Sequence, residues 1–206
     1  MNQQSTRPLL TAETFVDWAM SQPAGRFELL RGEVVAMSPE RVGHARVKKE
    51  VLKALDTALA RAGSGCEAFG DGMAVRIDDT TVYEPDASVR CGPRLPNDHV
   101  LFDDPVIVME VVSPSSTSLD AGSKLADYFR LASVRHYLFV HSEGRRVIHH
   151  RREESGEIIT RVLTEGEVIS FEPPGIGIAI ADLFATSDGR LAPCSHPPFR
   201  LKGALT

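Results

Sequence analysis

The sequence predicts a single α/β domain in which helices flank a central mixed β-sheet that carries additional β-hairpins. Three observations lead to this fold class. An apolar run at 106–112 has the length and composition of a strand covered on both faces. Two amphipathic segments, at about 40–62 and around Lys124, predict helices with one apolar face each. Short β-like segments bounded by turn residues lie before, between and after these elements.

Length and composition are those of an ordinary globular protein: of the 206 residues, 42% are hydrophobic and 25% charged. The sequence has no repeat, low-complexity tract or long linker. We therefore expect one domain over 1–206, with a core at about 11–185 and a loosely held tail at 193–206. No apolar stretch approaches the ~20 residues that span a bilayer. The N-terminus lacks a secretory pattern, so we expect a cytoplasmic protein without a membrane partner.

The first third of the chain predicts two helices and a hairpin. Thr11 is a suitable N-cap for a short helix that runs through about Met20. The segment RFELLRGEVVAMSP predicts two strands joined at Arg31-Gly32. A long helix at about Glu40–Ala62 has an apolar residue every four positions on one face. Three lysines are assigned to its solvated side: Lys48, Lys49 and Lys53.

The rest of the chain predicts mainly strands. Two β-like segments are expected around Met73–Ile77 and Val82–Val89, and the loop CGPRLPNDH separates them from the buried strand. After the helix that carries Lys124, RHYLFVHS and RRVIHHRR predict a hairpin around Glu143-Gly144. The segments EIITRVL, EVISFEP and GIGIAIADLFA complete the expected fold.

The cysteines and the net charge limit the classes of function. Cys66, Cys91 and Cys194 are odd in number, far apart and without a C-x-x-C pair, which argues against disulfides and against a zinc site. The formal net charge of −5 weighs mildly against a protein that coats nucleic acid. That objection is limited, because acidic residues gathered at a metal add negative charge without repelling a metal-bridged phosphate.

Glu110 interrupts the apolar run VIVMEVV and is the first candidate for a functional residue. Burying an ionised carboxylate is costly unless a cation or strong donors compensate it. Glu110 could face solvent at the end of the strand, or it could pair with an arginine such as Arg130 or Arg135. Alternatively, Glu110 and Asp86, on neighbouring strands, bind one magnesium ion. Such an ion acidifies a water that hydrolyses a phosphodiester, while a nearby lysine stabilises the transition state.

The order Pro85-Asp86 and then Glu110 resembles the PD-(D/E)XK nuclease superfamily. More closely, the chain resembles the Uma-two family of restriction-endonuclease-like proteins from bacteria, through landmarks that occur in the same order from residue 11 to about 184. These are ELLRGEVVAMSP followed by His44, EPDASV, VIVMEVVSPSS, Lys124-x3-Tyr128, RHYLFV and PPGIGIAIADLF. The resemblance implies a restriction-endonuclease-like fold and an endonuclease that hydrolyses DNA with magnesium or manganese. Nucleases of this fold often pair to cut two strands, so the resemblance also implies a homodimer.

Carried over residue by residue, the resemblance implies Asp86, Glu110 and Val111 as metal ligands. The sequence departs from the superfamily at the third position of the motif. A lysine usually follows the acid by two residues on the same strand face, and here that position is Val112. The nearest lysine that could take this role is Lys124. If its helix packs on that face of the strand, the Lys124 ammonium could lie beside Glu110.

A further acid often completes such a site from an earlier element, and we expect Glu33 in this role, with Glu28 as the reserve. His44 either caps or packs its helix or supports the metal and substrate. Tyr128 either orients Lys124 or buries its ring. The alternative to an enzyme is a non-catalytic module that keeps the fold for nucleic-acid or protein binding.

Overall fold

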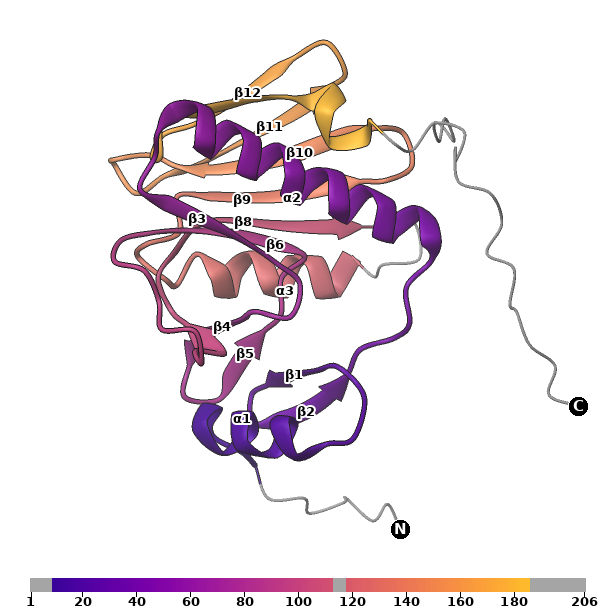
Figure 1. Cartoon of the computed structure of the whole chain (residues 1–206), viewed down its shortest axis with the longest axis vertical. Helices are drawn as coiled ribbons and strands as arrows, with labels where there is room; N and C mark the ends of the chain where they lie inside the picture. The colour runs from indigo at the N-terminus through magenta and orange to yellow at the C-terminus, as the bar shows by residue number, and fades with distance from the viewer. Residues whose placement is uncertain (1–8, 113–117, 186–206) are drawn as a thin grey trace, which may run out of the picture.

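The computed structural model describes residues 9–112 and 118–185, and Figure 1 shows the arrangement of its helices and strands. The elements in this part of the chain are α1 Ala12–Ser21, β1 Phe27–Leu30, β2 Glu33–Ala36, α2 Val42–Ala62, β3 Cys66–Gly70, β4 Ala74–Asp78, β5 Thr81–Tyr83, β6 Ala87–Cys91, β7 Leu101–Phe102, β8 Pro105–Val112, α3 Ser118–Tyr128, β9 His136–His141, β10 Arg146–Arg152, β11 Ile158–Thr164, β12 Val168–Phe171, β13 Ile176–Ala179 and the 3₁₀ helix η1 Ile180–Phe184. The predicted tail at 193–206 lies outside the described residues.

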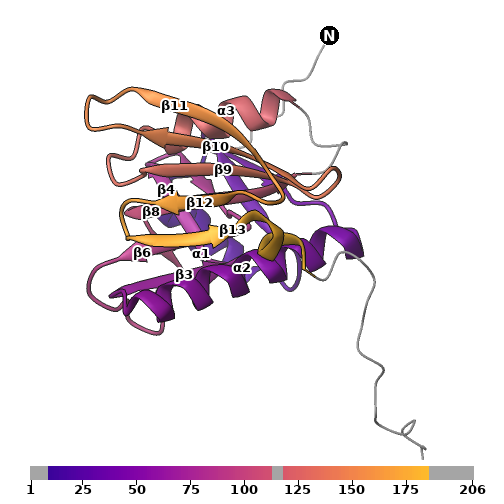
Figure 2. The ribbon, with the colours of Figure 1, turned by 90° about the horizontal axis from the view of Figure 1, so that it is seen from above.

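The larger sheet has six strands in the order β11-β10-β9-β8-β6-β3. Strands β8 and β9 are parallel, and the other neighbours are antiparallel. Helix α2, with β12, β13 and η1, covers one face, and α3 packs on the other, as Figure 2 shows from above. Strand β8 is therefore paired at both edges and covered on both faces, which explains its apolar sequence. The predicted mixed sheet flanked by helices is confirmed.

The smaller sheet, in the order β2-β1-β5-β4-β7, packs against α1 through a cluster that includes Phe15, Leu29 and Val82. The Thr11 hydroxyl accepts a hydrogen bond from the backbone N–H of the third helical residue, so the predicted N-cap is confirmed. The predicted hairpin is confirmed as well. Arg31 and Gly32, at its turn, both have positive φ angles, as two-residue turns between antiparallel strands require.

Three strands of the larger sheet and two helices have one end each on the same side of the molecule. The carboxyl ends of β8 and β9 lie on this side because the two strands are parallel. Strand β6 runs the opposite way, with Ala87 opposite Met109, so it begins beside the end of β8. Figure 1 shows α2 and α3 starting on the same side. Asp86, immediately before β6, is thereby placed next to the end of β8.

Two expectations for this half of the chain are wrong. The segment Val82–Val89 is not one strand: it is divided into β5 and β6, which belong to different sheets. Pro85 has no backbone N–H to donate to a ladder, so strand pairing is interrupted there. Cys66 and Cys91 form a disulfide, because they face each other directly across the β3–β6 ladder. Their spacing of 25 residues in the sequence gives no sign of this pairing.

Among the described residues, no helix combines the length and the apolar character that crossing a membrane would require.

Candidate functional site

Lys124 lies beside Glu110 at the end of β8. The Glu110 side chain leaves the strand on the same face as Val108, which is the face that α3 covers. From α3, the Lys124 ammonium reaches within 3.3 Å of Glu110 Oε1, and both residues are buried. The structure thus brings this lysine to the acid although Val112 occupies the usual lysine position. The partner of Glu110 is neither Arg130, which pairs with Asp78 and Asp127, nor Arg135.

Glu28, and not Glu33, is the additional acid at this point. The Lys124 ammonium donates to Glu28 Oε1 at 2.8 Å, and the same oxygen accepts the backbone N–H of Glu84 at 3.0 Å. Glu33 is exposed next to the hairpin turn and does not line the cavity. The structure therefore places Glu28, and not Glu33, beside Lys124, and the role of either acid stays a prediction. Glu28 lies two residues before the end of β1, far enough from the turn to reach the larger sheet.

Asp86 is held at both carboxylate oxygens. Its Oδ2 accepts the backbone N–H of Val111 at 2.7 Å, and the His44 Nε2 lies 3.5 Å from the same oxygen. Its Oδ1 is 2.8 Å from the ammonium of Lys48. The bond to Val111 fixes Asp86 next to Glu110, since Val111 is the following residue of β8. The predicted pair of acids and His44 are thus brought together.

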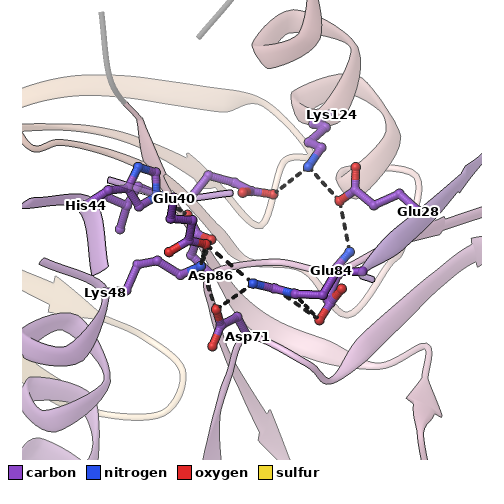
Figure 3. Close-up of polar contacts among 11 residues, drawn as sticks. Glu28, Glu40, His44, Lys48, Asp71, Glu84, Asp86 and Lys124 are labelled. Carbon is purple, nitrogen blue, oxygen red and sulfur yellow. Dashed lines mark hydrogen bonds and ion pairs between the residues drawn. The ribbon is translucent and has the colours of Figure 1, made fainter. Parts of the chain in front are cut away.

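Lys48 is the residue that the sequence analysis missed. The helical pattern predicts Lys48 on the solvated side, and this is wrong: Lys48 is 6% exposed, and its ammonium contacts Glu40, Asp71 and Asp86. Figure 3 shows this network, in which Arg26 also contacts Glu40 and Asp71. The signal that could have identified Lys48 is its position one helical turn after His44, which places both side chains on one face of α2.

The pKa values of Asp86 and Glu110 are shifted in opposite directions. Burial by itself would raise the pKa of Asp86, but the bond with His44, the charge of Lys48 and the Val111 amide lower it below its usual value. Burial raises the pKa of Glu110 to about 8. The positive charge of Lys124 opposes that rise, and the charges of Asp86 and Glu28 add to it. Titratable pairs whose environments separate their pKa values are typical of functional sites.

A cavity of about 850 Å³ opens over these residues. Asp86, Glu110, Lys124 and Glu28 line it from the two sheets and α3, while the start of α2 and the segment before it form another wall. Ser142 and Glu143, from the turn after β9, line it as well. The site is therefore open to a ligand larger than a single ion.

The donor set fits a hard divalent cation. Glu40, His44 and Asp86 each offer one ligand atom, and these atoms lie within 4.8 Å of one another. Glu110 adds a buried carboxylate on the adjacent strand. Carboxylate oxygens are the ligands that magnesium and manganese prefer. The sequence analysis predicted Asp86 and Glu110 for this role, and the structure adds Glu40 as a neighbouring donor.

Tyr128 packs as a core residue. It is fully buried, and its ring lies 5.5 Å from the ring of Tyr83 and 5.2 Å from that of Tyr137, centroid to centroid. Its hydroxyl has no hydrogen-bond partner in the described part of the chain. Of its two predicted roles, ring burial is the one the structure displays. Tyr83, in contrast, has its ring centroid 5.1 Å from the Lys124 ammonium, close enough for a cation–π contact.

Comparisons with known proteins identify relatives of this chain by sequence and by fold. Residues 12–181 match the model of the Uma2 family, which is described as "Putative restriction endonuclease". An uncharacterized protein of Synechocystis sp. is 24% identical over 174 residues, which cover 84% of this chain and 90% of that protein. A crystal structure from Anabaena variabilis, described as a "putative nuclease belonging to DUF820", superposes with a TM-score of 0.69 at 16% identity. That match covers 86% of this chain and 99% of the other.

The structural match shows that the fold is shared, and the family model spans the residues that build the site, from Glu28 to Lys124. The chain belongs to the Uma2 family of restriction-endonuclease-like proteins.

Proposed function

We propose that this protein is a divalent-metal-dependent endonuclease that hydrolyses phosphodiester bonds in DNA. The observation that carries the proposal is the meeting of Asp86, Glu110 and Lys124 on the floor of one open cavity. Membership of a family described as "Putative restriction endonuclease" supports the same reaction class. Magnesium or manganese is the proposed ion, because the donors are mainly carboxylates.

Each residue has a role that follows from its position. Asp86 and Glu110 would hold the ion, and the Val111 N–H fixes the orientation of Asp86. Bound there, magnesium or manganese would polarise a phosphoryl oxygen and acidify a water. Lys124 carries a positive charge next to Glu110, where negative charge develops on the phosphoryl group during hydrolysis. Glu28 orients the Lys124 ammonium through its bond at 2.8 Å.

The test combines metal binding with cleavage. Calorimetric titration with manganese should show binding to the wild-type protein and loss of binding in Asp86→Asn and Glu110→Gln. Both variants should also lose metal-dependent cleavage of duplex DNA. Glu33→Gln is the matched control, because Glu33 is an exposed acid outside the cavity. An equal loss in Glu33→Gln would contradict the assignment of the site.

One observation favours a second candidate function, a non-catalytic module. Each acid already has an ammonium partner within the protein: Lys48 for Asp86 and Lys124 for Glu110. Such a network can hold the fold together without any metal. Absence of metal binding in the wild-type protein, with the fold intact, would favour this alternative over the nuclease.

A further inference from the structure

Two arginines at the start of α2 line the cavity above the acids. Arg41 is the N-cap of the helix, Arg46 follows in its second turn, and both are exposed. They belong to the wall of the cavity whose floor contains Asp86 and Glu110. A ligand that reached the floor would therefore pass along two guanidinium groups.

Within the described chain, these two guanidinium groups form no ion pair with an acidic side chain. Most arginines of the described chain have an acidic partner or backbone carbonyl partners: Arg26, Arg76, Arg90, Arg130, Arg145, Arg151, Arg152 and Arg161. Among the described residues, no ion pair forms at Arg41 or Arg46. Glu40, the acid next to Arg41 in the sequence, is turned to Lys48 and Arg26 instead.

Negative and positive charges therefore occupy different parts of the cavity. On the floor, the carboxylates have lysine partners close to them, so most of the negative charge is compensated there. On the α2 wall, Arg41 and Arg46 add uncompensated positive charge. Arg41, at the N-cap, forms no side-chain cap hydrogen bond. The N–H groups of the first turn of α2 lack intrahelical partners, which adds a positive potential. Glu143, which also lines the cavity, would repel an anion.

We propose that Arg41 and Arg46 bind the phosphates of the DNA strand on either side of the bond to be cut. The proposal rests on the proposed nuclease function for the identity of the ligand. Arginine is suited to this contact because its planar group binds phosphate oxygens in pairs. The repulsion from Glu143 would keep the strand away from the turn after β9. Arg41 and Arg46 would position the strand without taking part in the chemistry.

The test is a salt titration of DNA binding without cleavage. Fluorescence anisotropy with a labelled DNA duplex, in EDTA, compares the wild-type protein with Arg41→Gln/Arg46→Gln. The control is Arg61→Gln/Arg94→Gln, which removes the same charge from two exposed arginines that also form no ion pair within the described chain and do not line the cavity. Thermal unfolding checks that both double variants remain folded.

Each phosphate contact contributes about 0.9 to the slope of log affinity against log salt concentration. Loss of two contacts should therefore reduce the magnitude of that slope by about 2 and weaken binding by at least about tenfold near 0.1 M salt. The control variant should keep the slope of the wild-type protein. Equal weakening in both double variants would show an effect of net charge alone and overturn the proposal. Tighter binding of an RNA duplex by the wild-type protein would overturn DNA as the ligand.

The DNA-binding test of Arg41 and Arg46 can fail independently of the metal-binding and cleavage test of the proposed nuclease function. A protein that binds DNA through Arg41 and Arg46 but binds no manganese would retain this inference and lose the nuclease assignment. A protein that binds manganese at Asp86 and cleaves DNA with unchanged affinity in Arg41→Gln/Arg46→Gln would do the reverse.

Discussion

The Lys48 ammonium contacts three carboxylates, and Lys48 lies one helical turn after His44. Replacing it by methionine keeps the aliphatic stem and leaves Glu40, Asp71 and Asp86 without that ammonium. Breaking a buried pair by removing one partner costs about 3–5 kcal/mol. Arg26 still contacts Glu40 and Asp71, so we expect a loss of about 3 kcal/mol in the free energy of unfolding. Urea denaturation measures it.

Lys49→Met is the control for this change, because Lys49 is the next residue of the same helix and is exposed. It should lose less than about 0.5 kcal/mol. Manganese should restore part of the stability of Lys48→Met, since a cation can then replace the missing ammonium. A loss of the same size in both variants would contradict the structural role of Lys48.

Lys124 should act on the reaction more than on metal binding. Its ammonium contacts Glu28 and Glu110, where a substrate phosphate would gain charge. Removing one preorganised stabilising group lowers rates by about 10²–10³. We therefore expect Lys124→Ala to reduce metal-dependent cleavage by about this factor while calorimetry still shows manganese binding. Full cleavage in Lys124→Ala, together with loss in Asp86→Ala, would refute the relocated-lysine hypothesis.

At the level of residues, the acids stand out by their chemistry, whereas Lys124 was indicated only by the resemblance to the nuclease superfamily, as the nearest lysine after the position that Val112 occupies. A lone carboxylate in an apolar strand and a Pro-Asp pair are visible in one sequence. The inward turn of Lys48 is not, because it depends on α2 crossing the start of β6, a contact between segments far apart in the chain. For the same reason, the sequence does not show which of Glu28 and Glu33 lies at the cavity. Both flank one turn, and only the position of the hairpin against the larger sheet separates them.

Among the elements, strand β6 connects the site with the disulfide. It follows Asp86 directly and ends at Cys91, which is bonded to Cys66 of the edge strand β3. Closing a loop of this length stabilises a fold by about 3 kcal/mol. Reducing the disulfide should lower the urea midpoint of the wild-type protein accordingly. The Cys66→Ala/Cys91→Ala variant should unfold at the lower midpoint with or without reductant; a response to reductant in that variant would contradict the assignment.

The boundaries of helices and hairpins were easier to predict than strand pairing. Caps, turns and apolar periodicity are local, so α1, α2 and the β1–β2 hairpin were recognised from short segments. The division at Pro85 depends on which sheet each half joins, and strand β3 was not recognised at all. Both outcomes are decided by contacts between distant segments. The cross-strand position of Cys66 and Cys91 belongs to the same class of information.

For the whole molecule, the dependence of stability on pH should reflect a buried histidine pair that lies outside the site. His136 is fully buried, and its Nε2 accepts the backbone N–H of Glu172 at 3.0 Å. Its Nδ1 therefore carries the proton and donates to the Nε2 of His149, also at 3.0 Å. Burial lowers the pKa of His136 to about 4 and that of His149 to about 3. The charge of Arg151 contributes to the lowering of both pKa values.

Both histidines are neutral in the folded protein but take up protons near pH 6.5 when it is unfolded. Below pH 6.5 the unfolded state then binds more protons, so the free energy of unfolding should fall as the pH drops from 6.5 towards 3. The steepest slope is about 1.4 kcal/mol per pH unit for each histidine. Acids with lowered pKa values, such as Asp71 and Asp78, add to the loss at its acid end.

Glu110 should shape the other side of the curve. Because its pKa is raised in the folded protein, its contribution to stability is present below about pH 4.5 and is lost as the pH rises towards 8. Urea denaturation between pH 4 and 8 should therefore give a maximum within that range. His149→Gln keeps an acceptor for the His136 Nδ1–H and should flatten the acid side, while Glu110→Gln should flatten the alkaline side. An acid slope that His149→Gln leaves unchanged would exclude the histidine pair as its origin.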